Sequence, residues 1–217
     1  MCLFSRSLII QSLAECINLA AATHVFATPS LWALLNASPE MVPTLICVTL
    51  GGEPISQHTI DTWSNCVVLL NMWGVTECTV GQTTMKCYPG CLPRLVGKPF
   101  DGVVIKIDFE EQWTKGHDEY VGVQSGSDAN LECSQIGEIL IGGVQTGVGY
   151  LNQSASTRDR FVSDSGVFDY EEKKCYIDDD VDKVVSDYHS LASTGSSCVW
   201  FRSGDFGRWN EGNLEVL

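Results

Sequence analysis

The order strand, loop, helix, strand between residues 45 and 71 constrains the fold more than any other feature of this sequence. Residues 45–50 are an unbroken run of apolar and β-branched side chains, which is typical of a buried parallel strand. The run ends at Gly-Gly-Glu-Pro, a helical stretch follows over residues 55–63, and residues 67–71 form a second apolar run. Two strands separated by a helix predict a parallel sheet that binds ligands at the carboxyl ends of its strands.

The residues before this unit continue the alternation. Residues 24–27 are a short apolar run, and Thr28 is a good N-cap for a helix that continues to residue 35. Residues 8–22 carry apolar side chains at helical spacing and predict an amphipathic helix. Polar residues interrupt this stretch, so it is too short to be a membrane span, and a secretory signal is the alternative interpretation.

From residue 96 onward, strand-like segments at 103–107 and 137–141 alternate with turns and long polar stretches. We therefore predict an α/β chain in two parts. Residues 1–95 form a layered α/β part with a parallel sheet, and residues 96–217 form a β-rich, distorted barrel-like part with polar insertions at 110–134 and 159–197. The acidic second insertion is interpreted as a solvated surface segment; the alternative, a calcium loop, lacks the ligand spacing of an EF-hand.

Charge and cysteine usage narrow the possible partners and the compartment. Thirteen basic residues against 27 acidic ones give a net charge of −14, whereas a nucleic-acid-binding surface needs a basic face. The same charge disfavours anionic membranes. The ten cysteines are scattered and include no C-x-x-C pair, which favours free thiols in a reducing, cytoplasmic compartment.

Four short motifs occur in a fixed order. They are Gly-Gly-Glu at 51–53, Asn-Met-Trp-Gly-Val-Thr-Glu at 71–77, Gly-Glu-Ile-Leu-Ile-Gly-Gly at 137–143 with Gly-Tyr-Leu at 149–151, and Phe-Arg-Ser-Gly-Asp-Phe at 201–206. Each alone could be a turn or a core segment. As an ordered set they resemble the adenylate-forming superfamily of acyl-CoA synthetases, nonribosomal-peptide adenylation domains and luciferases.

The resemblance implies a fold, a reaction and a set of cofactors. The chain would be part of the large N-terminal domain of an enzyme that uses ATP and Mg²⁺ to convert a small carboxylate into an acyl-AMP. The acyl group then passes to CoA or to the phosphopantetheine of a carrier protein. Because charge builds up at the α-phosphate, a metal ion and fixed dipoles should lower the barrier.

The same resemblance implies roles for individual residues. Glu77 would bind Mg²⁺, and Thr76 would face the α-phosphate. Trp73 stands where the family usually has Tyr and would stack on adenine. Asp205 would accept hydrogen bonds from both ribose hydroxyls. The other nucleotide-binding positions are Gly51, Gly52, Glu53, Asn71 and Gly74, and the acyl pocket would include Thr49, Met72 and Val80.

Two features of the family are missing from this sequence: the phosphate-loop motif, and the C-terminal domain with its catalytic lysine. We therefore expect a fragment that does not adenylate by itself. The residues of the motifs resemble those of β-alanine-activating enzymes, and a medium- or long-chain acyl-CoA synthetase is the alternative. An alternative of a different functional class is a catalytically inactive module that binds nucleotide or a partner protein.

Overall fold

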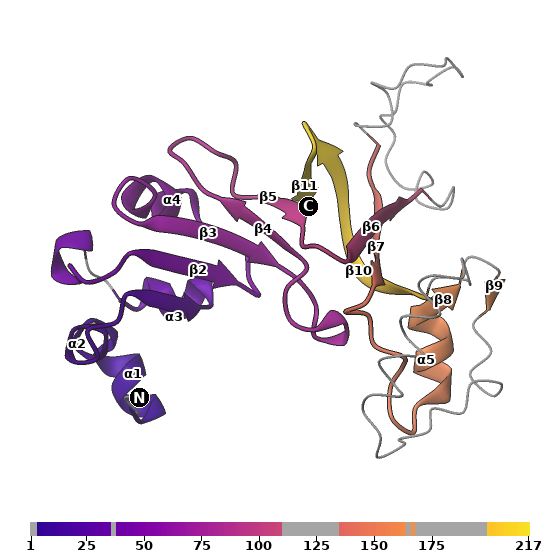
Figure 1. The fold of residues 1–217 in the computed structure, drawn as a ribbon, viewed down its shortest axis with the longest axis horizontal. Coiled ribbons are helices and arrows are strands. Elements are labelled where there is room, and N and C mark those ends of the chain that lie inside the picture. Colours follow the sequence, from indigo (N-terminus) through magenta and orange to yellow (C-terminus); the bar gives the residue numbers. More distant parts are fainter. Residues whose placement is uncertain (1–3, 36–37, 110–134, 164–165, 168–198) are drawn as a thin grey trace, which may run out of the picture. The chain divides into compact units, whose positions relative to one another are not determined.

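A computed structural model describes residues 4–35, 38–109, 135–163, 166–167 and 199–217 (Figure 1). These residues belong to two compact units. The first takes in the chain up to Gly74 together with Gly81–Lys98 and Trp209–Leu217, and the second takes in Val75–Val80 and Pro99–Arg208. The insertion at 110–134 and most of the one at 159–197 lie outside the described residues, and the division at residue 95 stays a prediction.

The first unit is built on a mixed sheet with the strand order β1-β2-β3-β4-β5-β11. Its first three strands are parallel, and Val48 of β2 lies opposite Val25 on one side and Leu69 on the other. β4 is antiparallel to β3, and β11 is antiparallel to β5. The strands are β1 (His24–Ala27), β2 (Cys47–Gly51), β3 (Val68–Trp73), β4 (Thr83–Lys86), β5 (Leu95–Pro99) and β11 (Asn213–Val216). The predicted α/β architecture with a parallel sheet is confirmed.

Short helices connect these strands. Each of the two helices next to the parallel strands begins at a hydroxyl N-cap, because Thr28 Oγ1 accepts from Leu31 N and Ser56 Oγ accepts from Thr59 N. Thr28 was the predicted cap. The helices are α1 (Arg6–Gln11), α2 (Leu13–Leu19), α3 (Pro29–Ala33) and α4 (Gln57–Trp63), and η1 (Pro39–Met41) is a single 3₁₀ turn.

The helix predicted over residues 8–22 is divided in two at Ser12. Ser12 has φ −146° and ψ 50°, which is not a helical conformation. Its N–H closes α1 on Leu8 O, and its own carbonyl accepts from Cys16 N to start α2. Serine is weak in a helix interior and common at helix ends, which explains why the apolar periodicity continues through a break.

The core of the first unit lies on one face of its sheet. Val48, Leu50 and Leu69 are fully buried there, in one cluster with Trp32 of α3 and Trp63 of α4. The two indoles meet edge to face, with ring centroids 4.8 Å apart. Residues on the other face are only partly covered, since Val68 is 38% exposed. The predicted burial of β2 is confirmed at Val48, Leu50 and Gly51, whereas Cys47 and Thr49 are half-buried.

The second unit is β-rich, as predicted. Its strands are antiparallel, β10 pairs with β7 on one side and with β8 on the other, and among the described strands the sheet stays open rather than closing into a barrel. The elements are η2 (Thr76–Cys78), β6 (Val103–Asp108), β7 (Gly137–Gly143), α5 (Ser154–Arg160), β8 (Phe161–Ser163), β9 (Gly166–Val167) and β10 (Val199–Asn210).

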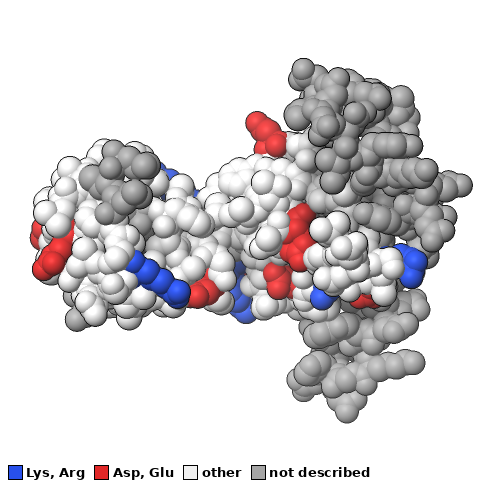
Figure 2. All heavy atoms as spheres, turned by 90° about the horizontal axis from the view of Figure 1, so that it is seen from below, with Lys and Arg blue, Asp and Glu red and all other residues white. Residues whose placement is uncertain are grey.

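Two surface properties bear on the expected partners. Within the ranges that the structure describes, no helix is both long and apolar enough to cross a bilayer. On the face shown in Figure 2, lysine and arginine side chains occur as separate spots among acidic and uncharged residues.

The thiols of this chain differ widely in accessibility. Cys78 and Cys87 are free and buried, and burial is the largest cause that raises the pKa of Cys78 to about 11 and that of Cys87 to about 12. Cys66 is free and exposed. Because the thiolate is the reactive form, we expect iodoacetamide at pH 8 to label Cys66 in the native protein, and Cys78 and Cys87 only after unfolding. Peptide mapping by mass spectrometry checks this, and rapid native labelling of Cys87 would contradict it.

Candidate functional site

Two of the sequence motifs meet at the carboxyl ends of β2 and β3. The register pairs Leu50 with Asn71 and Gly51 with Met72, so both motifs leave the sheet at the same edge. Open α/β sheets bind ligands at this edge. The structure therefore brings together the predicted residues of the first unit, which are Thr49, Gly51, Gly52, Glu53, Asn71, Met72, Trp73 and Gly74.

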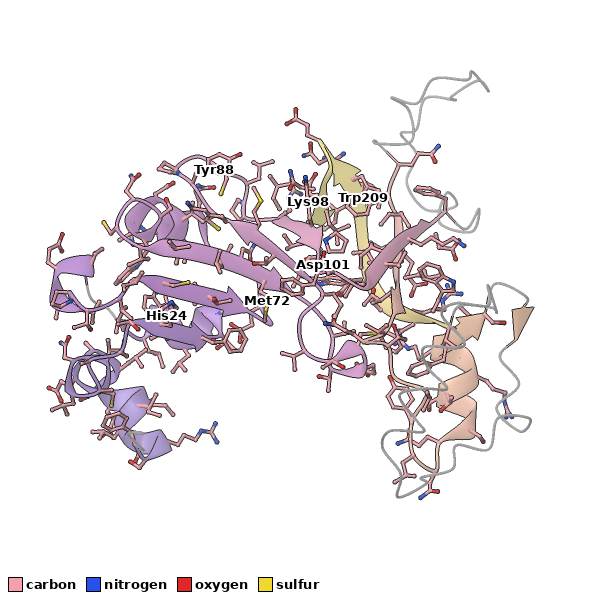
Figure 3. All side chains as sticks on the ribbon, viewed as in Figure 1. His24, Met72, Tyr88, Lys98, Asp101 and Trp209 are labelled. Carbon is pink, nitrogen blue, oxygen red and sulfur yellow. The ribbon has the colours of Figure 1, made fainter. Side chains whose placement is uncertain are left out.

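Glycine at position 51 is required by close packing against the neighbouring strand. A Cβ added to Gly51 would lie 2.8 Å from the backbone oxygen of Met72, and one added to Gly81 would lie 2.7 Å from the Met72 sulfur. The Met72 side chain, labelled at the end of β3 in Figure 3, therefore lies against two glycines. Gly52 is exposed and has φ +83°, and no atom of the described residues lies within 4 Å of an added Cβ, so a ligand could approach its Cα closely.

Glu53 binds the start of a neighbouring helix. Its carboxylate accepts hydrogen bonds from the backbone N–H of Ser30 at 2.9 Å and from the Ser30 hydroxyl at 2.8 Å. These contacts tie the loop after β2 to the first turn of α3. The sequence did not predict this role, and a contact between Glu53 and nucleotide stays a prediction.

Asn71 is committed to its own chain. It is 3% exposed, and its side-chain amide donates to the carbonyls of Pro93 and Leu95, each at 3.0 Å. Both amide hydrogens are thereby used to hold the segment between β4 and β5 against β3. Asn71 thus shapes the edge of the sheet from inside, and direct contact between its amide nitrogen and a base would require these bonds to be exchanged.

Trp73 and Thr49 are half-buried at the same end of the sheet. Trp73 is the last residue of β3, lies opposite Thr83 of β4, and accepts a hydrogen bond from Gln82 N through its backbone oxygen at 2.9 Å. Thr49 is in β2, on the face that the core cluster leaves partly exposed. These positions leave part of each side chain available to a ligand.

The other predicted residues, Thr76, Glu77, Val80 and Asp205, belong to the second unit. Thr76 and Glu77 begin η2, where the Thr76 side chain is exposed and the Glu77 side chain is half-buried. The backbone oxygen of Glu77 accepts from Gly147 N at 2.8 Å, and a Cβ on Gly147 would lie 2.9 Å from that oxygen. The turn after β7 therefore packs directly against η2.

The Glu77 side chain is held by a tyrosine. Tyr150 Oη donates to Glu77 Oε1 at 2.6 Å, a short distance typical of a hydroxyl bonded to a charged carboxylate. Burial, and then this hydrogen bond to Glu77, raise the pKa of Tyr150 to about 12. The hydroxyl therefore stays protonated, and remains a donor, throughout the neutral pH range.

The residues near Glu77 fit a magnesium ion that is completed by phosphate oxygens. In the part of the chain that the structure describes, no group of three or more His, Cys, Asp or Glu side chains could hold a metal. Within these described ranges the second Glu77 oxygen, Oε2, has no hydrogen-bond partner. One carboxylate plus phosphates and water is the usual protein environment of Mg²⁺ in nucleotide sites.

The backbone is strained just after η2. Thr79 and Val80 have φ of 65° and 68°, and a β-branched residue is costly in this left-handed region. The Thr79 hydroxyl donates to Gln145 O at 3.0 Å, and Val80 is 62% exposed. Strain of this kind concentrates at functional sites, where surrounding contacts maintain it.

Asp205 lies in a bulge of β10. The pairing of β10 with β7 shifts register between Arg202 and Phe206, and Gly204 within the bulge has φ +79°. Glu138 of β7 fixes the bulge, because its carboxylate accepts from Gly204 N at 3.1 Å and from Arg202 Nε at 2.9 Å. A bulge re-aims a side chain locally, and here that side chain belongs to half-buried Asp205.

Sequence reasoning missed two residues of this arrangement. Tyr150 and Glu138 both lie in a quoted motif, but the motif assigned neither a role. Their partners Glu77 and Gly204 are 73 and 66 residues away in the chain. A sequence offers no local pattern for such contacts, so their occurrence inside a motif was the one available signal.

Comparison with known proteins identifies the family. The model of the family described as AMP-binding enzyme matches residues 1–151. The hydroxamate-type ferrichrome siderophore peptide synthetase of Schizosaccharomyces pombe is 33% identical over 191 residues, which cover 88% of this chain and 4% of that protein. The nonribosomal peptide synthetase atnA of Emericella nidulans is 31% identical over 222 residues, which cover 100% of this chain and 2% of that protein. The chain thus spans a small part of the curated relatives it matches.

Solved structures support the same fold. PA1221, a nonribosomal peptide synthetase protein containing adenylation and PCP domains, matches with a TM-score of 0.65 and 20% identity over 94% of this chain and 34% of that one. The N-terminal subdomain of Klebsiella oxytoca NpsA, in complex with 3-hydroxyanthranilyl-AMSN, matches with a TM-score of 0.62 and 19% identity over 100% of this chain and 43% of that one. None of these comparisons concerns a β-alanine-activating enzyme. The family match over residues 1–151, on a fold shared with adenylation domains, shows that this chain belongs to the AMP-binding enzymes.

Proposed function

We propose that this chain supplies nucleotide-binding residues to an enzyme that activates a carboxylic acid as its acyl-AMP, at the expense of ATP. The observation that carries the proposal is the Glu77 carboxylate, which has one oxygen fixed by Tyr150 at 2.6 Å and the other without a hydrogen-bond partner among the described residues. A carboxylate held in this way is suited to a hard cation. Membership in the AMP-binding family supports the choice of nucleotide.

We assign the phosphate-facing roles to Thr76 and Glu77. The exposed hydroxyl of Thr76 can donate to an α-phosphate oxygen, and Glu77 can hold Mg²⁺ through Oε2. When bound, the ion neutralises charge that develops on the phosphate during attack by the carboxylate. The contribution of the protein is to keep both side chains oriented before the reaction, which lowers the reorganisation cost.

We assign contacts with the nucleoside and the acyl group to the remaining motif positions. Gly51, Gly52, Glu53 and Gly74 would line the base with their backbone, Trp73 would stack on it, and Asn71 would support this edge through its bonds to Pro93 and Leu95. Asp205 would accept the two ribose hydroxyls. Thr49, Met72 and Val80 would contribute to the acyl pocket.

We propose an amino acid as the carboxylate and a carrier-protein phosphopantetheine as the acceptor thiol, rather than CoA. The support is the set of curated relatives, which are peptide synthetases. The free thiols of the described cysteines support a reducing, cytoplasmic location. The division into an α/β part at 1–95 and a β-rich part at 96–217 remains part of this proposal.

Binding of ATP to the chain tests the proposal. We expect isothermal titration to detect ATP binding that is tighter with Mg²⁺ than with EDTA. In Glu77→Ala, affinity in Mg²⁺ should fall on the order of 100-fold while affinity in EDTA changes little. The readout is binding because binding requires fewer groups than turnover.

The matched control is Glu15→Ala, which removes an exposed carboxylate from α2 and should leave both affinities unchanged. Wild-type affinity in Mg²⁺ that survives the loss of Glu77 would contradict the role of this residue. Absence of any ATP binding by the wild-type chain would instead favour a module that binds a partner protein.

A further inference from the structure

Several hydrogen bonds join the segment that carries Glu77 to the loop that carries Tyr150. The loop that carries Tyr150 also carries Gly147, whose N–H binds the Glu77 backbone oxygen, and Gln145, whose carbonyl accepts from the Thr79 hydroxyl. One loop therefore holds this segment at three points: the backbone of Glu77, the side chain of Thr79 just after η2, and the carboxylate of Glu77.

The position of Tyr150 is itself fixed by contacts with α5 and with an aromatic cluster. Its backbone N–H donates to the hydroxyl of Thr157 on α5 at 2.9 Å, and Thr157 is 1% exposed. Its ring and the ring of Phe161 form a T-shaped pair, with centroids 5.6 Å apart and planes at 78°, and Phe161 packs in turn on Phe201. A phenol anchored by a buried hydroxyl and an aromatic cluster has few orientations, so its oxygen is a rigid donor.

The hydrogen bond from Tyr150 makes the two oxygens of the Glu77 carboxylate unequal as metal ligands. A free glutamate side chain rotates about three bonds, and a metal that binds it must stop this motion at an entropic cost. With Oε1 occupied by Tyr150, the torsions are already set, and Oε2 is the oxygen that remains open among the described residues. Partners of this kind typically change metal affinity 10–100-fold when removed.

We propose that Tyr150 is a positioning residue that orients Glu77 for the metal ion of the nucleotide site. The proposal rests on the function proposed above, and it adds a residue whose loss should have an effect that can be measured separately from nucleotide binding itself. Tyr150 does not touch substrate or nucleotide in this scheme, so its loss should weaken only the metal-dependent part of binding.

The test compares ATP affinity in Mg²⁺ with ATP affinity in EDTA for each variant. In Tyr150→Phe the aromatic contact with Phe161 is retained and only the hydroxyl is lost. We expect the gain in affinity from Mg²⁺ to fall about tenfold, with affinity in EDTA and the melting temperature unchanged. Tyr88→Phe, at an exposed tyrosine of the first unit, is the matched control and should behave as wild type.

A double-mutant cycle separates positioning from packing. If Tyr150 acts through Glu77, then Tyr150→Phe on a Glu77→Ala background should cause no further loss of the Mg²⁺ effect. A normal Mg²⁺ effect in Tyr150→Phe, or an equal loss in Mg²⁺ and in EDTA, would overturn the inference alone. A normal Mg²⁺ effect in Glu77→Ala would overturn the proposed function of Glu77 and this inference with it.

Discussion

Replacing Gly97 with alanine is expected to lower the free energy of unfolding of the first unit by about 4 kcal/mol or more. Gly97 lies in β5 with φ +82°, and a Cβ there would be 1.9 Å from the backbone oxygen of Thr84 and 2.5 Å from its carbonyl carbon. Backbone atoms cannot rotate away as a side chain can. Two neighbouring strands would have to separate, and β5 would also lose its register with Leu214 of β11.

Gly90→Ala distinguishes this clash from the conformational cost alone. Gly90 has the same φ of +82°, but no atom of the described residues lies within 4 Å of an added Cβ. The turn from Tyr88 to Cys91 closes on it with a 3.0 Å hydrogen bond and exposes the new methyl group. We expect a loss of about 1 kcal/mol, the usual cost of a left-handed alanine.

Urea unfolding, followed by tryptophan fluorescence to which the buried Trp32 and Trp63 of the first unit contribute, measures both variants. Both glycines have φ of +82°, but Gly97 is buried in a strand against the backbone of Thr84 and Met85, whereas Gly90 is exposed in a turn. Equal and small losses in Gly97→Ala and Gly90→Ala would mean that β4 and β5 do not approach as closely as described.

Local patterns carried enough information for the parallel core of the first unit. An apolar run, a hydroxyl cap such as Thr28 and the glycine at position 51 all act within a few residues, so reading the sequence in short windows recovers β1, β2, β3 and α3. The same approach failed at Ser12, where the apolar spacing suits a helix and the backbone leaves it. The hydrophobic period records which side faces the core and not whether the helix is continuous.

The candidate site was only partly accessible to such reasoning. Motif positions located Asn71, Glu77 and Asp205, but the contacts that orient these side chains come from distant segments. Asn71 reaches Leu95, 24 residues on, and Glu77 is reached by Tyr150, 73 residues on. Tertiary contacts of this length depend on how strands are ordered, which no single window of sequence records.

The bulge that carries Asp205 leads to the second large effect. Asp205→Asn is expected to weaken AMP binding about 30- to 100-fold, since one charged acceptor for a vicinal diol is replaced by an amide that can accept with one oxygen only. The fold should survive. Asp205 N–H donates to Ser203 Oγ, and Ser203 Oγ donates to Ile139 O at 2.7 Å, and asparagine keeps both of these bonds and nearly the same side-chain volume.

Isothermal titration with AMP, together with a melting temperature for each variant, separates binding from stability. Asp101→Asn removes an exposed aspartate of the same unit, labelled in Figure 3, and should leave the affinity at the wild-type value. Asp205→Asn that binds AMP as tightly as wild type would remove Asp205 from the nucleoside site. A loss of affinity with an unchanged melting temperature would instead mean that the register shift of β10, fixed by Glu138, serves to present this one carboxylate to a ribose.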